Sequence, residues 1–514
     1  MSTAHSNAAK EFLKNQTYAK WHDATFWAVR TKRDNMAYGL EEWEQLREKA
    51  SQIKRHTITH LDEYLDQFAT KAEENGCIVH WAKDAHEFNE IVYGILKNHN
   101  VKKLVKSKSM LTEECGMNPY LEAHGIEVVE TDLGERIIQL KGQAPSHIVM
   151  PAIHLNHDVK KMVKSKSMLT EECEMNPYLE SKGIEVVETD LGERIIQLKG
   201  QAPSHIVMPA IHLNHDDVGE LFEEKLGSEK GNHDPTYLTY VARLSLRNEF
   251  LTADAGMTGG NFGIAETGDI VVCTNEGNAD MSTSCPKLHI AAIGLEKIIP
   301  NYDCLAVFQR MLCRAGTGQP TTTFTSHFRK ARPTAHPMHI VLVDNGRSEW
   351  IGNPEHWEAL KCIRCGSCMN TCPVYRRSGG YSYSYFIPGP IGINLGMLRD
   401  PQKHSGNVSA CTLCNSCQTL CPAKVNLGDQ IYLWRQQLDE FGTANPQKKT
   451  MCKGMSLVYG NEGIYNLGTA LAHWANLIPS PLMNCGLNPW AEGHKMMEFP
   501  KEPFHSLWKK GKVK

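Results

Sequence analysis

The sequence lacks the features that mark membrane, secreted and nucleic-acid-binding proteins. Its 514 residues contain no unbroken run of eighteen apolar residues, which a membrane-spanning helix would need. The opening MSTAHSNAAKEFLKNQ has neither the apolar core nor the small-residue cleavage site of a secretory signal. Lysine and arginine number 55 against 58 acidic residues, and no basic stripe indicates nucleic acid or anionic lipid. We therefore expect a cytoplasmic protein with no transmembrane segment and no nucleic-acid partner.

The sequence also lacks a dinucleotide-binding fingerprint. No G-x-G-x-x-G motif follows a predicted strand and opens a helix, and the glycine-rich GMTGGNFG has a different spacing. Flavin and nicotinamide cofactors are therefore not indicated, and any redox chemistry is expected to proceed by one-electron steps rather than by hydride transfer.

Two cysteine-rich runs near the C-terminus are the most informative feature that is present. CIRCGSCMNTCP (362–373) and CTLCNSCQTLCP (411–422) both spell C-x2-C-x2-C-x3-C-P. Cysteines three residues apart can supply three of the four thiolates of a [4Fe–4S] cube, while the last cysteine of each run ligates the other cube. The spacing therefore predicts two [4Fe–4S] clusters. The expected ligands are Cys362, Cys365, Cys368 and Cys421 for the first cluster, and Cys411, Cys414, Cys417 and Cys372 for the second.

Structural zinc and disulfides are the alternatives to these clusters. Zinc ligands usually come as separated pairs rather than as four cysteines within eleven residues. Disulfides need an oxidising compartment, which this sequence does not suggest. The other nine cysteines are scattered without paired spacing, and most are expected to be buried thiols. The cluster interpretation is therefore favoured.

The chain contains a nearly identical tandem duplication, residues 101–158 and 159–216, whose copies differ at four positions. Structural repeats of solenoids drift apart in sequence, whereas these copies share even their loops, so a recent in-frame duplication is indicated. Each copy is predicted to form a β-α-β-α-β piece. Because only one copy can occupy a given set of sheet positions, we expect that the other loops out or packs poorly.

The remaining sequence predicts an α/β protein with a mostly parallel sheet. Strand-like and helix-like segments alternate, including a helix over 55–76, which implies a parallel sheet covered by helices. A chain of this length needs more than one domain. The expected divisions are an N-terminal helical segment at 1–75, the α/β domain at 76–350, a helical two-cluster domain at 351–425 and a helical C-terminal region at 426–514.

A small-anion site in the α/β domain is a second, weaker hypothesis. Lysines with hydroxyl neighbours close a predicted strand in each copy of the duplication, and such strand ends suit a carboxylate or phosphate. A solvated strand end with glycine turns is the competing interpretation. The candidate residues are Lys106, Lys108, Lys164, Lys166, Glu266 and Thr267, and no catalytic residue is assigned.

Several stretches resemble the lactate utilisation protein B family, and the likeness covers most of the chain. They are, in order, VKSKSMLTEE, VVETDLGE, SHIVMPAIH, GGNFGIAETGDI, TNEGNAD, VLVDNGRSE and CIRCGSCMNTCPVYR. The resemblance implies a LUD domain, similar to the phosphosugar isomerase and CoA-transferase fold, followed by a ferredoxin-type domain. The tandem duplication of residues 101–216 departs from the family pattern.

The resemblance also implies a function. Such a protein is the non-catalytic iron–sulfur subunit of an L-lactate dehydrogenase complex, and relays electrons through two [4Fe–4S] clusters toward the respiratory chain. Its implied partners are a subunit with cysteine-rich repeats, a lone LUD-domain subunit and a respiratory electron acceptor, through which it could attach to the inner membrane. The alternative is that the LUD domain is itself an acyl- or sugar-phosphate-type enzyme and that the clusters are structural or sensory.

Overall fold

The chain divides into two compact units, residues 2–438 and residues 439–514. The second copy of the duplication, at 159–216, lies outside the described residues, and the divisions expected after residues 75, 350 and 425 stay predictions. The computed structural model describes residues 4–14, 16–101, 103–106, 111–112, 115–130, 223, 227–232, 234–274, 277–330, 337–383, 385, 387–443, 446–478 and 499–512.

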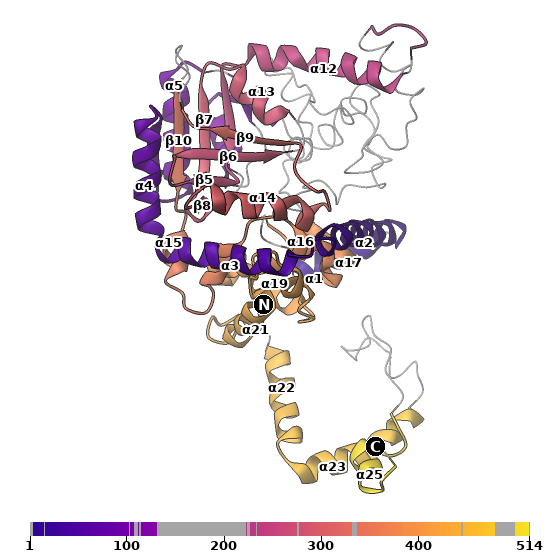
Figure 1. The fold of residues 1–514 in the computed structure, drawn as a ribbon. Helices are drawn as coiled ribbons and strands as arrows, with labels where there is room; N and C mark the ends of the chain where they lie inside the picture. The colour runs from indigo at the N-terminus through magenta and orange to yellow at the C-terminus, as the bar shows by residue number, and fades with distance from the viewer. Residues whose placement is uncertain are drawn as a thin grey trace. The chain divides into compact units, whose positions relative to one another are not determined.

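A six-stranded parallel sheet forms the centre of the larger unit (Figure 1). Every neighbouring pair in it is parallel, as the alternation of strands and helices predicts. The two strands reading MHIVLV and HIAAIG are buried along their whole length, as strands covered on both faces must be. The strand order is β1 (Ile78–Ala82), β10 (Met338–Val343), β7 (His289–Gly294), β4 (Ala255–Gly259), β2 (Lys103–Lys106) and β3 (Glu127–Glu130).

Two helices cover opposite faces of this sheet. Along β10, Val341 and Val343 pack into the same core as α5, whereas Ile340 and Leu342 pack into the same core as α4. Successive side chains of a strand point to opposite faces, so one strand serves both cores. The first copy of the duplication contributes β2, α7 and β3, as predicted for its first half. The helices are α4 (Leu61–Glu74), α5 (Ala85–Asn98) and α7 (Met117–Ala123).

The prediction of one helix over 55–76 is wrong at its start. Helix α3 (Trp43–Thr59) continues to Thr59, and α4 begins at Leu61. Between them, His60 has φ −125° and ψ 35°, which lies outside helical geometry. The break lets the two halves serve different cores, because α4 packs against the six-stranded sheet and α3 packs against a second sheet.

This second, four-stranded sheet was not predicted from the sequence. Its core contains Phe262 of β5, Phe308 of α14 and Trp43 of α3, and Ile363 of the first cysteine motif packs into the same core. Apolar packing therefore attaches the cysteine motif directly to the α/β part of the unit. The elements are β8 (Ile298–Ile299), β5 (Phe262–Ile264), β6 (Asp269–Thr274), β9 (Phe324–Phe328) and α14 (Tyr302–Gly316).

Short helices make up the cysteine-containing region, and the two N-terminal helices pack against it (Figure 1). Four of the motif cysteines directly follow the last residue of a helix, namely Cys362, Cys372, Cys411 and Cys421, whereas Cys365 and Cys414 lie in short loops. The elements are α1 (Ala4–Lys14), α2 (Gln16–Tyr38), α15 (Arg347–Ile351), η3 (Trp357–Lys361), α16 (Ser367–Thr371), α17 (Pro373–Ser378), α18 (Gly389–Arg399), α19 (Pro401–Ala410), α20 (Ser416–Leu420) and α21 (Leu427–Gln437).

The smaller unit is helical, as predicted for the C-terminal region. Within it, the side chain of Asn476 both donates to and accepts from the backbone of Phe499, at 2.7 and 2.9 Å. Among the helices that the structure describes, none combines the length and apolar character needed to cross a membrane. The elements of this unit are α22 (Pro446–Tyr459), α23 (Glu462–Leu471), η5 (Ala472–Leu477) and α25 (Phe504–Lys509).

Candidate metal centre

The two cysteine motifs adopt the same backbone conformation in their first turn. Arg364 and Leu413 both stand two residues after the first cysteine of their motif, with φ angles of 60° and 54°. The backbone N–H of Arg364 donates to the sulfur of Cys362, and that of Leu413 donates to the sulfur of Cys411, both at 3.3 Å. Such bonds favour the charged thiolate over the neutral thiol. Each motif thus presents a turn that can wrap a cluster.

The first predicted set of cysteines lines one pocket, although its members come from both motifs. Cys362, Cys365 and Cys368 surround the pocket from the first motif, and Cys421 joins them from the second. The backbone N–H of Val425 donates to the sulfur of Cys421 at 3.3 Å. Sulfur donors in a largely apolar cavity suit a [4Fe–4S] cube. The other lining residues are Ile363, Gly366, Ser367, Ile391, Pro422, Ala423, Val425 and Leu427.

The second predicted set is also brought together across the two motifs. Burial, followed by the charges of Cys411 and Cys414, raises the pKa of Cys372 to about 11. Burial and the charges of the same three cysteines raise the pKa of Cys417 well above its usual range. Cys372 of the first motif thus lies within electrostatic range of the first three cysteines of the second motif. Cys414 is the exposed member, so this set lies nearer to solvent than the first.

The chemistry of the thiols fits a polynuclear metal cluster. Burial raises the pKa of Cys365 to about 12 and that of Cys421 to about 11, so their thiolates need a compensating positive charge. None of the eight motif cysteines forms a disulfide. Four thiols that line one pocket fit the four-cysteine ligand set of a [4Fe–4S] cube.

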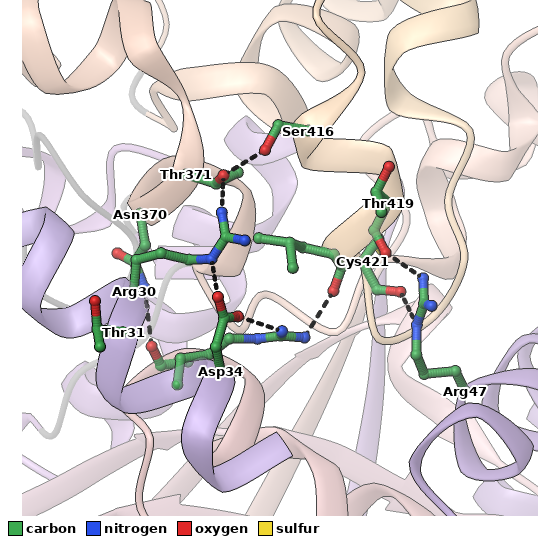
Figure 2. A network of polar contacts seen from close by, with 12 residues as sticks. Arg30, Thr31, Asp34, Arg47, Asn370, Thr371, Ser416, Thr419 and Cys421 are labelled. Carbon is green, nitrogen blue, oxygen red and sulfur yellow. Dashed lines mark hydrogen bonds and ion pairs between the residues drawn. The ribbon is translucent and has the colours of Figure 1, made fainter. Parts of the chain in front are cut away.

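Arginines of helices α2 and α3 bind the backbone at the end of the second motif (Figure 2). Arg33 donates to the carbonyl of Leu420 at 3.1 Å, and Arg47 donates to the carbonyls of Thr419 and Cys421 at 2.7 and 3.0 Å. These carbonyls end helix α20, where cations complement both the unpaired acceptors and the helix dipole. The position of Cys421, at the end of this helix, therefore depends on α2 and α3.

Arg30 of α2 links the two motifs to each other (Figure 2). Its guanidinium contacts the hydroxyl of Thr371 and pairs with Asp34 at 2.7 Å. The hydroxyl of Thr371 in turn shares a hydrogen bond of 2.5 Å with that of Ser416. Thr371 precedes the last cysteine of the first motif, and Ser416 precedes the third cysteine of the second motif. The contact thus holds the chain beside Cys372 of the first motif against the chain beside Cys417 of the second, two cysteines predicted to share the second cluster.

A buried ion cluster lies between the six-stranded sheet and the first motif. Glu296, 2% exposed, pairs with Arg347 and also with Arg364 of the first motif, the latter at 3.4 Å. Lys54 of α3 donates to the main-chain carbonyl of Glu296. Burial by itself raises the pKa of Glu296, but Arg347 and Arg364 outweigh it and lower the pKa to about 2. Burial lowers the pKa of Lys54 to about 7.

The candidate anion-binding residues belong to different parts of the fold. Lys106 ends β2 of the larger sheet, whereas Glu266 and Thr267 lie on the turn between β5 and β6 of the smaller sheet. That turn packs against the end of α4, because the carbonyl of Thr267 accepts a hydrogen bond from the side chain of Asn75 at 2.8 Å. An anion site stays a prediction. Three candidates lie outside the described residues: Lys108, Lys164 and Lys166.

Sequence reasoning did not single out the charged residues around the cysteines. Arg33, Arg47, Lys54 and Glu296 are far from both motifs in sequence, and only folding brings them near. One signal was available for Lys54. It stands on the buried stripe of α3, between Ala50 and Ile58, where a lysine requires a partner.

Comparison with known proteins agrees with this architecture. The LUD domain family matches residues 65–175 and 155–345, two matches that overlap inside the duplicated block, and the 4Fe-4S dicluster domain family matches residues 358–425. The protein therefore combines a LUD domain with a domain that carries two [4Fe–4S] clusters.

Relatives match the chain over most of its length. Lactate utilization protein B of Oceanobacillus iheyensis is 36% identical over 492 residues, which is 93% of this chain and 90% of the relative. Its counterpart in Geobacillus thermodenitrificans is 37% identical over 440 residues, 84% of this chain and 80% of the relative. The uncharacterized electron transport protein YkgF of Escherichia coli is 33% identical over 493 residues, 94% and 91% of the two chains. The chain belongs to the lactate utilization protein B family.

Proposed function

We propose that this protein is the iron–sulfur electron-transfer subunit of a multi-subunit system that oxidises L-lactate to pyruvate. The dicluster domain and the family establish the coarser role of an iron–sulfur electron-transfer protein. The observation that carries the proposal is the closeness of the two thiol sets. After burial and the charge of Cys362, Cys417 of the second set is the next group that raises the pKa of Cys368, ahead of Cys365 of the first set. Two clusters held so close together suit a relay.

In this proposal each cluster takes three ligands from one motif and the fourth from the other. When bound, a cluster accepts and releases single electrons, and the protein supplies its sulfur ligands, its backbone N–H donors and its dry surroundings. In this arrangement Cys421 of the second motif binds the first cluster, and Cys372 of the first motif binds the second cluster. The two motifs therefore cannot move apart without breaking a bond between a cluster and a cysteine. The sets are Cys362, Cys365, Cys368 and Cys421, and Cys411, Cys414, Cys417 and Cys372.

The chemistry on lactate belongs to partner subunits in this proposal, and this chain is non-catalytic. The proposed partners are a subunit with cysteine-rich repeats and a lone LUD-domain subunit, with a respiratory acceptor downstream. Supporting this division, Glu296 and Arg347 follow the carboxyl ends of β7 and β10. Substrates of α/β enzymes usually bind at that edge of the sheet, and here a buried ion pair occupies the edge beside β7 and β10.

Four single cysteine variants test the ligand sets. Cys365→Ser and Cys414→Ser provide the electron paramagnetic resonance (EPR) spectra of protein lacking the first or the second intact cluster. Cys421→Ser should then match Cys365→Ser, and Cys372→Ser should match Cys414→Ser, because the last cysteine of each motif crosses over. If each variant instead damages the cluster of its own motif, the crossed ligand sets are refuted.

Anaerobic co-purification with the products of neighbouring genes tests the lactate role. Addition of L-lactate to the assembled complex should reduce the clusters, seen as a new EPR signal, while the same addition to this protein alone should produce none. Clusters that stay unchanged while the complex turns over lactate would refute the relay. That result would favour a LUD-domain enzyme with structural clusters.

A further inference from the structure

The two motifs share a backbone conformation but differ in charge at one equivalent position. Arg364 and Leu413 occupy the same place in their turns, and each donates its N–H to the first cysteine sulfur. In the first motif this position carries a cation, 8% exposed at the side chain, and in the second it carries an apolar side chain. The two motifs are therefore electrostatically unequal at this position, whereas the cation beside the second set, Arg435, comes from α21 and donates to the carbonyl of Cys411.

The cation at position 364 is part of a larger positive group. Glu296 provides one carboxylate, which pairs with both Arg347 and Arg364, while Lys54 binds the carbonyl of the same glutamate. The charge of a Cys362 thiolate is among the causes that raise the pKa values of Lys54, Arg364 and Lys297, so these three cations lie within its electrostatic range. Cations therefore outnumber the carboxylate beside the first pocket.

One buried donor of Arg364 fits an anionic group beside the first pocket. Its Nη1 is buried and has no hydrogen-bond partner within the described part of the chain. An unsatisfied charged donor is costly to bury unless an anion faces it. The thiolate ligands and sulfides of a [4Fe–4S] cluster carry such negative charge, and Cys362, the neighbouring ligand, lies two residues away.

The ion cluster is positioned by the LUD sheet rather than by the cysteine motif. Glu296 follows β7, and Arg347 follows β10, the strand beside it in the sheet. Gly294 leaves room for the pair, since an added Cβ would lie 2.9 Å from Nε of Arg347 and closer still to the carboxylate. Figure 1 shows α15 and α3 together at one end of the sheet, beside the cysteine-containing helices.

We propose that this buried cationic group gives the first cluster a higher reduction potential than the second, so that electrons passing through the protein collect at the first cluster. Reduction adds one electron and one negative charge to a cluster and breaks no bond, and the electron comes from the second cluster, which is oxidised by the same step. Nearby buried cations stabilise the reduced form more than the oxidised form. The inference rests on the ligand sets proposed above.

Redox titration of the isolated protein, followed by EPR without lactate, tests this inference. Arg364→Gln should lower the reduction potential of the first cluster by about 59 mV, which corresponds to about a tenfold change in its reduction equilibrium. Glu296→Gln should raise the same potential, because it removes the only carboxylate described in this ion cluster. Arg364→Lys keeps the charge and should stay near the wild-type value. The second cluster should keep its potential in all three variants.

Opposite shifts separate an electrostatic effect from structural damage, which would act in one direction. Arg55→Gln is the matched control, since Arg55 is 60% exposed and its charge is screened by solvent. Should Arg364→Gln not take up iron, Glu296→Gln alone decides by the sign of its shift. Shifts no larger than that of the control, shifts of the same sign, or a second cluster of higher potential would overturn the inference. Because this titration contains no lactate, a result that refutes the potential difference does not refute the proposed role in lactate oxidation. Likewise, refuting the lactate role does not refute the potential difference.

Discussion

Replacing Arg33 by methionine should destabilise the large unit and its first cluster. The side chain of Arg33 is 1% exposed, pairs with Asp34 at 2.9 Å and donates to the carbonyl of Leu420 at 3.1 Å. Its guanidinium also lies over the rings of Tyr38 and Trp43, at 5.3 and 5.4 Å from their centroids. The residue thus joins α2 and α3 to the end of α20, next to Cys421.

The magnitude follows from what each contact loses. Breaking a buried ion pair from one side costs about 3–5 kcal/mol, but Asp34 retains Arg30 at 2.7 Å, which places the cost near the lower end. The methionine stem and sulfur recover part of the contact with the two aromatic rings. We therefore expect a loss of about 3 kcal/mol in the free energy of unfolding.

Anaerobic urea unfolding, followed by cluster absorbance and tryptophan fluorescence, measures this loss. Arg377→Met is the control, because Arg377 is 66% exposed and its pair with Asp23 spans 3.2 Å, so its cost should stay below about 1 kcal/mol. The first cluster should also be released at lower urea in Arg33→Met than in wild type. Equal midpoints for the two variants would refute the idea that Arg33 anchors the second motif.

Three further predictions concern pH, packing and the duplication. The pKa of Glu296 falls from 4.5 to about 2 on folding, so its ionised carboxylate contributes about 3 kcal/mol to the free energy of unfolding. This contribution is fully present above pH 4.5 and is lost as the pH falls toward 2. Urea midpoints of Glu296→Gln should therefore vary less with pH in this window than those of wild type. Gly316→Ala places a Cβ 2.7 Å from the carbonyl oxygen of Cys365, so it should displace the loop that carries this cysteine. We expect a loss of roughly half of the bound iron, measured by colorimetric assay, because one of the two clusters is lost. Full iron occupancy would contradict this. Deletion of residues 159–216 should leave a folded protein with both clusters, checked by circular dichroism and iron content, because one copy suffices for the sheet positions; an unfolded product would show that both copies are needed.

The sequence alone was sufficient for the cofactor and the class of fold. Ligand spacing in C-x2-C-x2-C-x3-C-P is a local property, so the type of cluster can be inferred without knowing the fold. Continuous apolar strands alternating with amphipathic helices likewise predict a parallel sheet, and the six-stranded sheet confirms it. The family resemblance added the LUD domain, which the comparisons confirm.

Only the tertiary structure decided what surrounds the cysteines. The break at His60, the four-stranded sheet and the ion cluster on Glu296 depend on contacts between segments that are far apart in sequence. Propensity and periodicity report on local structure, whereas the partner of a buried charge is chosen by packing across the fold. The sequence thus predicted which sulfur atoms bind iron, and folding determined the electric field in which those atoms lie.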